Sequence, residues 1–201
     1  MSRLIARKAP DFTAAAVLGN GEITDKFHLY SALKGKYGVV FFYPMDFTFV
    51  CPTELIAFDH RYSEFSERHV ELIAVSIDSQ FTHHAWRSTP LNKGGIGPVQ
   101  YTMVADVDHS IAQAYEVEHP EARVAVRGAF LIGKDSVVRA ALINDLPLGR
   151  NVDEMLRLVD ALQYYDKHGE VCPAGWNKGD KAMKATPEGV TSYLSDHGDS
   201  L

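Results

Sequence analysis

Cys51 stands at a position where a thiol could act as a nucleophile. Residues 38–43 form a continuous apolar run rich in β-branched and aromatic residues, which is typical of a strand buried on both faces. After the cysteine, apolar residues recur at helical spacing: Leu55, Phe58, Tyr62 and Phe65. We therefore expect Cys51 at the junction between a central strand and a helix of about residues 52–66.

The residues that flank Cys51 favour a reactive sulfur. Pro52 suits the first helical position, and Glu54 follows the cysteine by three residues, as in a capping box with sulfur in place of the usual hydroxyl. Unpaired backbone N–H groups and the helix dipole would then favour the thiolate. The alternative is an inert buried cysteine, which is the commoner case in apolar stretches. The helix-start position favours the reactive interpretation.

Two more residues of this segment could assist the thiol. Thr48 is close enough in a tight loop to donate a hydrogen bond to the sulfur or to a bound ligand. Pro44 would stiffen the loop and shield the thiol from one side. Each is a weak signal alone, because turns often contain both residue types.

The rest of the chain alternates between strand and helix patterns. Strands are predicted at residues 70–77 and 103–106, helices at 79–88 and 110–115, and an antiparallel pair at 124–132 and 137–143. Asn20-Gly21 predicts an earlier hairpin turn, and Asn151 begins a helix that ends near residue 168. This order predicts an α/β fold with a central mixed sheet flanked by helices.

The last part of the chain has a different character. Residues 169–201 hold short, broken segments and a helix of two or three turns that starts at Thr186-Pro187, so we expect an arm beyond a main domain of residues 1–168. Such a short helix is marginal alone in water and must dock, either on its own domain or on another subunit. The second cysteine, Cys172, lies in this arm.

Composition excludes several function classes. The net charge is −6 and the 20 basic residues are dispersed, so no nucleic-acid partner is expected. No apolar run is long enough to span a membrane, and the first residues lack an apolar signal core, which makes the cytoplasm the expected location. In that compartment a pair of cysteines favours a transient catalytic disulfide over a structural one. The nine histidines, including His83-His84, lack zinc-ligand spacing; we expect surface or packing roles, no metal and no cofactor.

Residues 42–54, Phe-Tyr-Pro-Met-Asp-Phe-Thr-Phe-Val-Cys-Pro-Thr-Glu, resemble the active-site signature of the peroxiredoxins. The similarity is to the typical two-cysteine class that contains the bacterial alkyl hydroperoxide reductase C subunits. It extends over nearly the whole chain, with matching residues at Trp86, Arg127, Arg150 and Cys172. The resemblance implies a thioredoxin-like fold that carries its redox centre at the first strand-to-helix junction.

The resemblance also implies residue roles. Arg127, a lone arginine in an apolar strand, needs an anionic partner; Glu54 alone could serve, but the family places such an arginine beside the thiolate, where it helps to hold peroxide. Arg150 matches a second arginine of that network. Cys172, in Val-Cys-Pro-Ala-Gly-Trp, corresponds to the resolving cysteine.

Two segments resemble elements that the family links to over-oxidation of the reactive cysteine. Residues 94–97, Gly94-Gly95-Ile96-Gly97, match a Gly-Gly-Leu-Gly segment, although by composition they read as a flexible surface turn. Tyr193-Leu194 matches a Tyr-Phe pair with leucine in place of phenylalanine. This substitution leaves the degree of sensitivity open.

The function implied is a thiol peroxidase. Cys51 would reduce hydrogen peroxide or organic hydroperoxides and become a sulfenic acid, and Cys172 of a partner subunit would form a disulfide with it. Thioredoxin or a flavoprotein disulfide reductase would complete the cycle. The family also implies a homodimer and a ring of five dimers.

The sequence admits two other functions and disfavours a third. A holdase chaperone, formed when the protein is over-oxidised, would survive Cys51→Ser, whereas peroxidase activity would not. A peroxide sensor that relays oxidation to a partner is compatible with the sequence. A thioredoxin-like disulfide reductase is disfavoured, because position 54 is glutamate and not the second cysteine of a Cys-x-x-Cys motif.

Overall fold

The computed structural model describes residues 3–200, and the chain divides into two compact units, Met1–Val152 and Asp153–Leu201. The strands, all in the first unit, are β1 (Thr13–Val17), β2 (Ile23–His28), β3 (Tyr37–Phe42), β4 (Val70–Ser76), β5 (Thr102–Ala105), β6 (Arg127–Ile132) and β7 (Val138–Asn144). The helices are α1 (Leu29–Ala32), α2 (Cys51–His60), α3 (Tyr62–Glu67), α4 (Gln80–Ser88), α5 (Ser110–Ala114), α6 (Val152–His168) and α7 (Pro187–His197), with short 3₁₀ turns η1 (Leu91–Lys93) and η2 (Gly198–Ser200). Compactness groups α6 with the C-terminal arm, and the predicted division after residue 168 stays a prediction.

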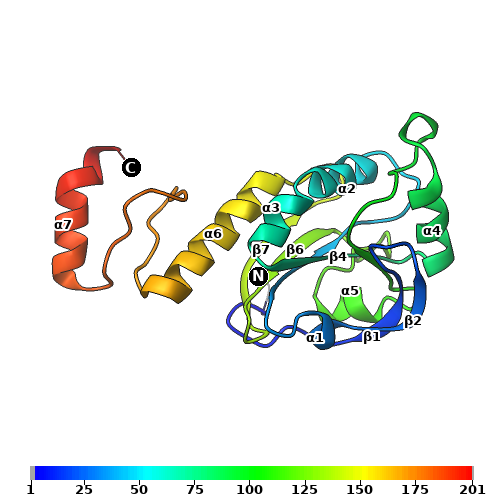
Figure 1. The fold of residues 1–201 in the computed structure, drawn as a ribbon, viewed down its shortest axis with the longest axis horizontal. Helices are drawn as coiled ribbons and strands as arrows, with labels where there is room; N and C mark the ends of the chain where they lie inside the picture. The colour runs from blue at the N-terminus through cyan, green and yellow to red at the C-terminus, as the bar shows by residue number, and fades with distance from the viewer. Residues whose placement is uncertain (1–2, 201) are drawn as a thin grey trace. The chain divides into compact units, whose positions relative to one another are not determined.

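One seven-stranded sheet forms the centre of the first unit, in the order β2-β1-β5-β4-β3-β6-β7 (Figure 1). β4 pairs in parallel with both β3 and β5, and the remaining pairs are antiparallel. The mixed sheet flanked by helices confirms the predicted fold class. The hairpins at Asn20-Gly21 and between β6 and β7 are confirmed as well.

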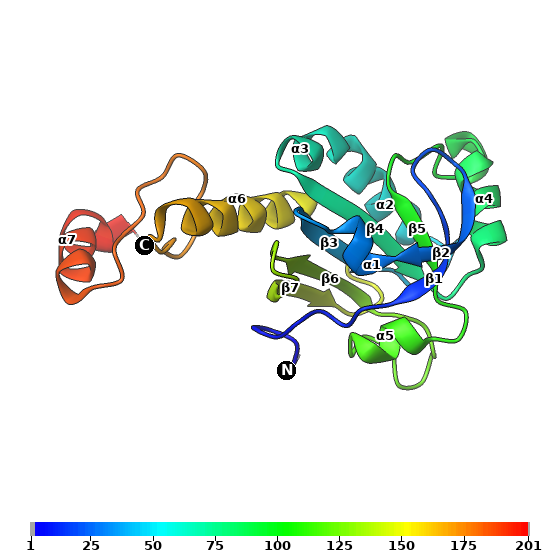
Figure 2. The same ribbon diagram turned by 60° about the horizontal axis from the view of Figure 1, so that its bottom comes forward.

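Both faces of the sheet are covered, which explains the continuous apolar run of β3. Alternate residues of this strand point to opposite faces. Phe41 stacks on Phe58 of α2 with 4.0 Å between ring centroids, and Phe42 contacts Tyr115 and Phe130 on the other face. Figure 2 shows α2 and α3 over one face and α5 over the other. A strand covered in this way gives the segment that follows it a rigid starting point.

Two predicted element boundaries were wrong. The expected helix of residues 52–66 is interrupted at Arg61, whose backbone (φ −101°, ψ 5°) leaves the helical region between α2 and α3. The strand expected from residue 124 begins at Arg127, since before it only Ala125 forms an isolated bridge, with Glu118. Arg127 is therefore the first residue of β6, next to the loop that precedes this strand.

The second unit consists of most of α6, the arm and α7. The arm turns back on itself through a bridge between Val171 and Met183, and α7 begins as predicted, with the Thr186 hydroxyl accepting a hydrogen bond from the Gly189 N–H. Within this unit Trp176 is buried, and its ring lies 5.1 Å from that of Tyr164 on α6. The part of the arm around Trp176 thus packs on α6, whereas α7 has no buried residue, so the docking of this short helix on its own domain or on another subunit stays a prediction.

Candidate active site

The sulfur of Cys51 lies in the first turn of α2, at the end of the segment that follows β3. Cys51 as a whole is 1% exposed. The helix N-cap is Val50, which makes no side-chain capping bond; the Thr53 hydroxyl instead donates to the Val50 carbonyl at 2.7 Å. The predicted capping box between Cys51 and Glu54 was therefore wrong. Cys51 is already helical, and the Glu54 carboxylate bonds two arginines instead of the helix start.

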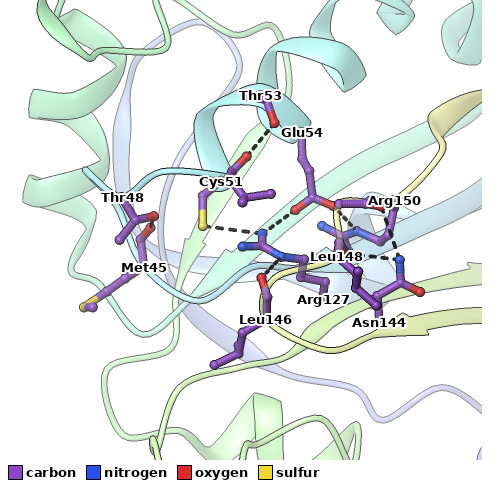
Figure 3. A network of polar contacts seen from close by, with 12 residues as sticks. Met45, Thr48, Cys51, Thr53, Glu54, Arg127, Asn144, Leu146, Leu148 and Arg150 are labelled. Atoms are coloured by element: carbon purple, nitrogen blue, oxygen red, sulfur yellow. Dashed lines mark hydrogen bonds and ion pairs between the residues drawn. The ribbon is translucent and has the colours of Figure 1, made fainter.

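Arg127 contacts both the sulfur and Glu54. Its Nη1 lies 3.6 Å from Cys51 Sγ and 2.6 Å from Glu54 Oε2, while its Nε donates to the Leu146 carbonyl at 2.6 Å (Figure 3). The sequence left open whether this arginine pairs with Glu54 alone or also faces the thiol, and the structure contains both contacts. A guanidinium held at three points cannot swing away from the sulfur without losing buried hydrogen bonds.

Arg150 completes the charged cluster. Its Nε and its backbone N–H both donate to Glu54 Oε1 at 2.8 Å, and its guanidinium lies over the rings of Phe41 and Phe58. Burial by itself would raise the pKa of Glu54, but the charge and hydrogen bonds of Arg150, together with the charge of Arg127, outweigh it and hold that pKa below its ordinary value. The cluster thus holds two cations and one anion, and one of the two cations lies 3.6 Å from the Cys51 sulfur.

The other predicted residues lie beside the sulfur. Thr48 donates its hydroxyl proton to the Met45 carbonyl at 2.8 Å (Figure 3). Of the two predicted acceptors, the sulfur does not receive this proton in the structure, and a bound ligand stays a prediction. The hydroxyl oxygen of Thr48 therefore keeps lone pairs that can accept a hydrogen bond from a ligand. Next to Cys51 is an apolar hollow of about 370 Å³. Its lining residues are Pro44, Thr48, Phe49, Val50, Cys51, Arg127, Leu146 and Pro147.

The hydrogen bonds of one buried polar side chain, His83 of α4, were not predicted from the sequence. His83 is fully buried, with Nδ1 2.7 Å from Asp46 Oδ2 and Nε2 3.2 Å from the Val104 carbonyl. Tyr43 donates to the other oxygen of Asp46 at 2.7 Å. These bonds hold the segment before Cys51 to α4. The signal was present, because His83 precedes Trp86 by three residues and so shares its buried helix face.

The segments matched to over-oxidation lie in different units. Residues 94–97 follow η1 in the first unit, where Trp86 Nε1 donates to the Gly94 carbonyl at 2.9 Å. Tyr193 and Leu194 belong to α7 in the second unit, and Leu194 is half exposed.

Cys172 lies in the arm, and it and Cys51 are both free thiols. Its Sγ donates to the Ala161 carbonyl of α6 at 3.5 Å. Burial raises the pKa of the Cys172 thiol, with a smaller opposing effect from Arg157. In this conformation Cys172 is held on its own helix and is mostly protonated at neutral pH.

Two absences are found within residues 3–200, one of a membrane span and one of a metal-ligand cluster. None of the helices described is both long and apolar enough to cross a membrane. No cluster of three or more histidine, cysteine, aspartate or glutamate side chains in this part of the chain is arranged to hold a metal ion.

Comparison with known proteins gives consistent matches over nearly the full length. Residues 5–141 match the AhpC/TSA family, and residues 161–196 match the C-terminal domain of 1-Cys peroxiredoxin. The chain is 58% identical to alkyl hydroperoxide reductase C of Helicobacter pylori strain J99 over 98% of this chain and 100% of that protein. It is 49% identical to mouse peroxiredoxin-2, covering 96% of each. The reduced 2-Cys peroxiredoxin of Plasmodium vivax superposes with a TM-score of 0.92 at 45% identity, over 96% of this chain and 98% of that one.

Proposed function

This chain belongs to the AhpC/TSA family and is a thiol peroxidase of the peroxiredoxin type, and on that premise we propose that Cys51 is the group that reduces hydrogen peroxide and organic hydroperoxides. The observation that carries the proposal is the Arg127 guanidinium 3.6 Å from the Cys51 sulfur, at the wall of an apolar hollow. A hydroperoxide has a small polar head and, in organic substrates, an apolar substituent that such a hollow can accept.

In the first step the Cys51 thiolate attacks the nearer oxygen of the peroxide. The sulfur–oxygen bond forms as the O–O bond breaks, the sulfur is oxidised to a sulfenic acid, and the departing oxygen leaves as alkoxide or hydroxide and takes up a proton. The products are Cys51–SOH and an alcohol or water. Because charge moves from sulfur to the leaving oxygen, a cation that faces both would stabilise the transition state.

The residues around the hollow would bind the peroxide through different contacts. Arg127 would donate to the peroxide oxygens, while Thr48, whose proton is committed to Met45, would accept from the peroxide O–H. Pro44 would restrict access to the sulfur. Glu54 and Arg150 would hold Arg127 in place.

In the second step the Cys172 thiol would condense with the sulfenic acid to give a disulfide and release water. The proposed pairing is between subunits of a homodimer, five of which would form a ring. An external dithiol, either thioredoxin or a flavoprotein disulfide reductase, would reduce the disulfide. Both thiols are free in this structure. The proposed location is the cytoplasm, whose reducing environment would return the two cysteines to the thiol state.

Over-oxidation would compete with this second step. A second peroxide would convert the sulfenic acid to a sulfinic acid wherever disulfide formation is slow. We place Gly94, Gly95, Ile96 and Gly97, together with Tyr193 and Leu194 of α7, among the residues that set this competition.

Non-reducing intact-mass analysis after one equivalent of hydrogen peroxide tests the mechanism. A covalent dimer of twice the chain mass, absent in Cys51→Ser and in Cys172→Ser, is the expected result. A monomer lighter by two hydrogens would place the disulfide within one chain. The absence of any oxidised product within seconds would overturn the assignment of Cys51.

A further inference from the structure

Trp86 of α4 lies between the segment that carries Cys51 and the glycine segment of residues 94–97. We propose, on the basis of the function proposed above, that Trp86 is a positioning residue that couples these two segments. Through this coupling it sets the fraction of time for which Cys51 is exposed to a second thiol.

Cys51 must become exposed for a disulfide to form. The two sulfurs of a disulfide are bonded at about 2.05 Å with Cβ atoms about 3.8 Å apart, which demands direct access by the second side chain. Cys51 is 1% exposed, and Pro44, Thr48, Phe49 and Val50 of the preceding segment line the same hollow as this residue. Peroxide can reach the sulfur through the hollow, but a cysteine on a polypeptide cannot reach it unless this segment and the first turn of α2 move.

On one side, the Trp86 ring packs against this segment. Its centroid lies 5.7 Å from the ring of Phe47 and 6.1 Å from that of Tyr43, and Trp86 itself is fully buried. Phe47 has a φ of +53°, a backbone region that non-glycine residues adopt at an energetic cost. The packing on Trp86 therefore helps to hold this residue in a conformation that it would otherwise leave.

On the other side, Trp86 is bonded to the glycine segment. Its indole N–H donates to the Gly94 carbonyl at 2.9 Å, and its backbone carbonyl accepts from the Ile96 N–H at 3.4 Å. The segment is folded closely on the end of α4, since a Cβ on Gly95 would lie 1.8 Å from the Thr89 carbonyl oxygen. A shift of either segment thus disturbs the ring that holds the other.

The coupling acts on the competition between two reactions of the sulfenic acid. When Cys51 stays buried, a second peroxide transfers an oxygen to the sulfur, giving a sulfinic acid and an alcohol or water. When Cys51 is exposed, the Cys172 thiol displaces the sulfenic oxygen as water and forms the disulfide. Weaker contacts between Trp86 and either segment therefore favour exposure of Cys51, and hence formation of the disulfide.

The variant Trp86→Phe tests this in the full-length protein. Phenylalanine keeps an aromatic ring against Phe47 but lacks the N–H that bonds Gly94. Loss of one hydrogen bond of ordinary strength shifts an opening equilibrium about two- to ten-fold. We therefore expect the sulfinate-to-disulfide ratio, measured by intact mass over a peroxide titration, to fall by about that factor, while the rate of the first oxidation of Cys51 stays unchanged.

Two further variants separate coupling from general destabilisation. Tyr115→Phe also removes one partly buried hydrogen bond, from the Tyr115 hydroxyl to the Pro10 carbonyl at 3.0 Å, but lies in the core on the α5 face of the sheet. It should leave the ratio unchanged at a similar loss of stability. Phe47→Leu weakens the link from the other side, at a half-exposed position that tolerates substitution. It should lower the ratio too, and the double variant should fall short of the product of the single effects.

The inference is overturned if the ratio is unchanged in both Trp86→Phe and Phe47→Leu, or if Tyr115→Phe lowers it equally. It is also overturned if the first oxidation slows as much as the ratio falls, because Trp86 would then act on the chemistry. Failure of the proposed function has a different signature: the unmodified protein would form neither product on Cys51.

Discussion

At the scale of single residues, the site depends on one carboxylate shared by two arginines. Glu54 bonds Arg127 through one oxygen and Arg150 through the other, and all three side chains are almost fully buried. An odd positive charge in such a place is costly unless an anion joins it. The Cys51 sulfur lies 3.6 Å from Arg127 Nη1, so the cluster that supports the fold also places a cation beside the predicted reactive atom.

Arg127→Lys tests the role of the guanidinium. Lysine keeps the charge but cannot reach the sulfur, Glu54 and the Leu146 carbonyl together. We expect the first-turnover rate with hydrogen peroxide, measured by stopped flow, to fall about 100-fold, the typical loss for one preorganised donor. Arg139→Lys, at an exposed pair with Asp135, should leave the rate unchanged. A change of less than threefold in Arg127→Lys would reduce Arg127 to a structural partner of Glu54.

Glu54→Gln tests the buried ion pairs. It leaves two buried arginines with a neutral partner, so we expect a loss of about 3 kcal/mol in the free energy of unfolding at pH 7, by urea titration. The folded state lowers the pKa of Glu54, so its stabilisation is complete above the unfolded pKa of about 4.3 and is lost as pH falls through the folded value.

The difference between Glu54→Gln and the unmodified protein should therefore be largest at neutral pH and shrink in acid. Glu64→Gln, at an exposed pair with Arg61, should cost less than about 0.5 kcal/mol. An equal loss at pH 7 and pH 3 would contradict the ionic origin of the effect.

At the scale of elements, α2 has one anchored end and one end that must move. Phe58 stacks on Phe41 of β3, and the Tyr101 hydroxyl donates to the Leu55 carbonyl at 2.8 Å. The first turn lacks a side-chain cap. Opening at Cys51 can therefore leave the later turns of α2 on the sheet, which limits the conformational change to the residues around the sulfur.

Phe58→Ala tests the anchor. Removal of a fully buried aromatic ring should reduce the free energy of unfolding by about 3–5 kcal/mol, measured by urea denaturation. Phe49→Ala is the matched control, because Phe49 is 93% exposed and its truncation should change stability by less than about 0.5 kcal/mol. Similar losses in both variants would show that α2 is not anchored through Phe58.

At the scale of the whole molecule, the two thiols belong to different compact units. Cys51 lies with the charged cluster of the first unit, and Cys172 lies in the arm beside Arg157 and α6 of the second. In the proposed mechanism the first unit holds the groups that act on peroxide, and the second supplies a protonated thiol that reacts only afterwards. This order suits a cycle in which the second cysteine does not compete for peroxide.

The disulfide-forming step should depend steeply on pH. Burial raises the pKa of Cys172 above that of an ordinary thiol, so its thiolate fraction, and with it the rate of disulfide formation, should rise nearly tenfold per unit between about pH 7 and 8. Arg157→Gln removes the opposing cation and should shift this profile to higher pH. A flat profile in stopped-flow measurements would exclude Cys172 deprotonation as part of this step.

The sequence by itself determined the parts of this protein that rest on local patterns. Strand and helix periodicity predicted the mixed sheet, and the signature around Cys51 predicted the reactive thiol together with Pro44 and Thr48. The fold prediction is confirmed because periodicity is a property of neighbouring residues. Pro44 and Thr48 line the same hollow as Cys51, and their roles in the reaction stay predictions. The resemblance added Arg150 and Cys172 and assigned Arg127 to the thiol, a long-range contact that no local pattern predicts.

Only the tertiary structure decided how distant side chains pair. The capping-box pattern at Cys51 was local and plausible, but Arg127 and Arg150, from other parts of the chain, bond Glu54 instead. His83, expected to be a surface or packing residue, is buried, and only the fold shows that its partner is Asp46. In both cases a long-range hydrogen bond in a buried place decides the pairing, because burial strengthens such bonds and penalises their absence.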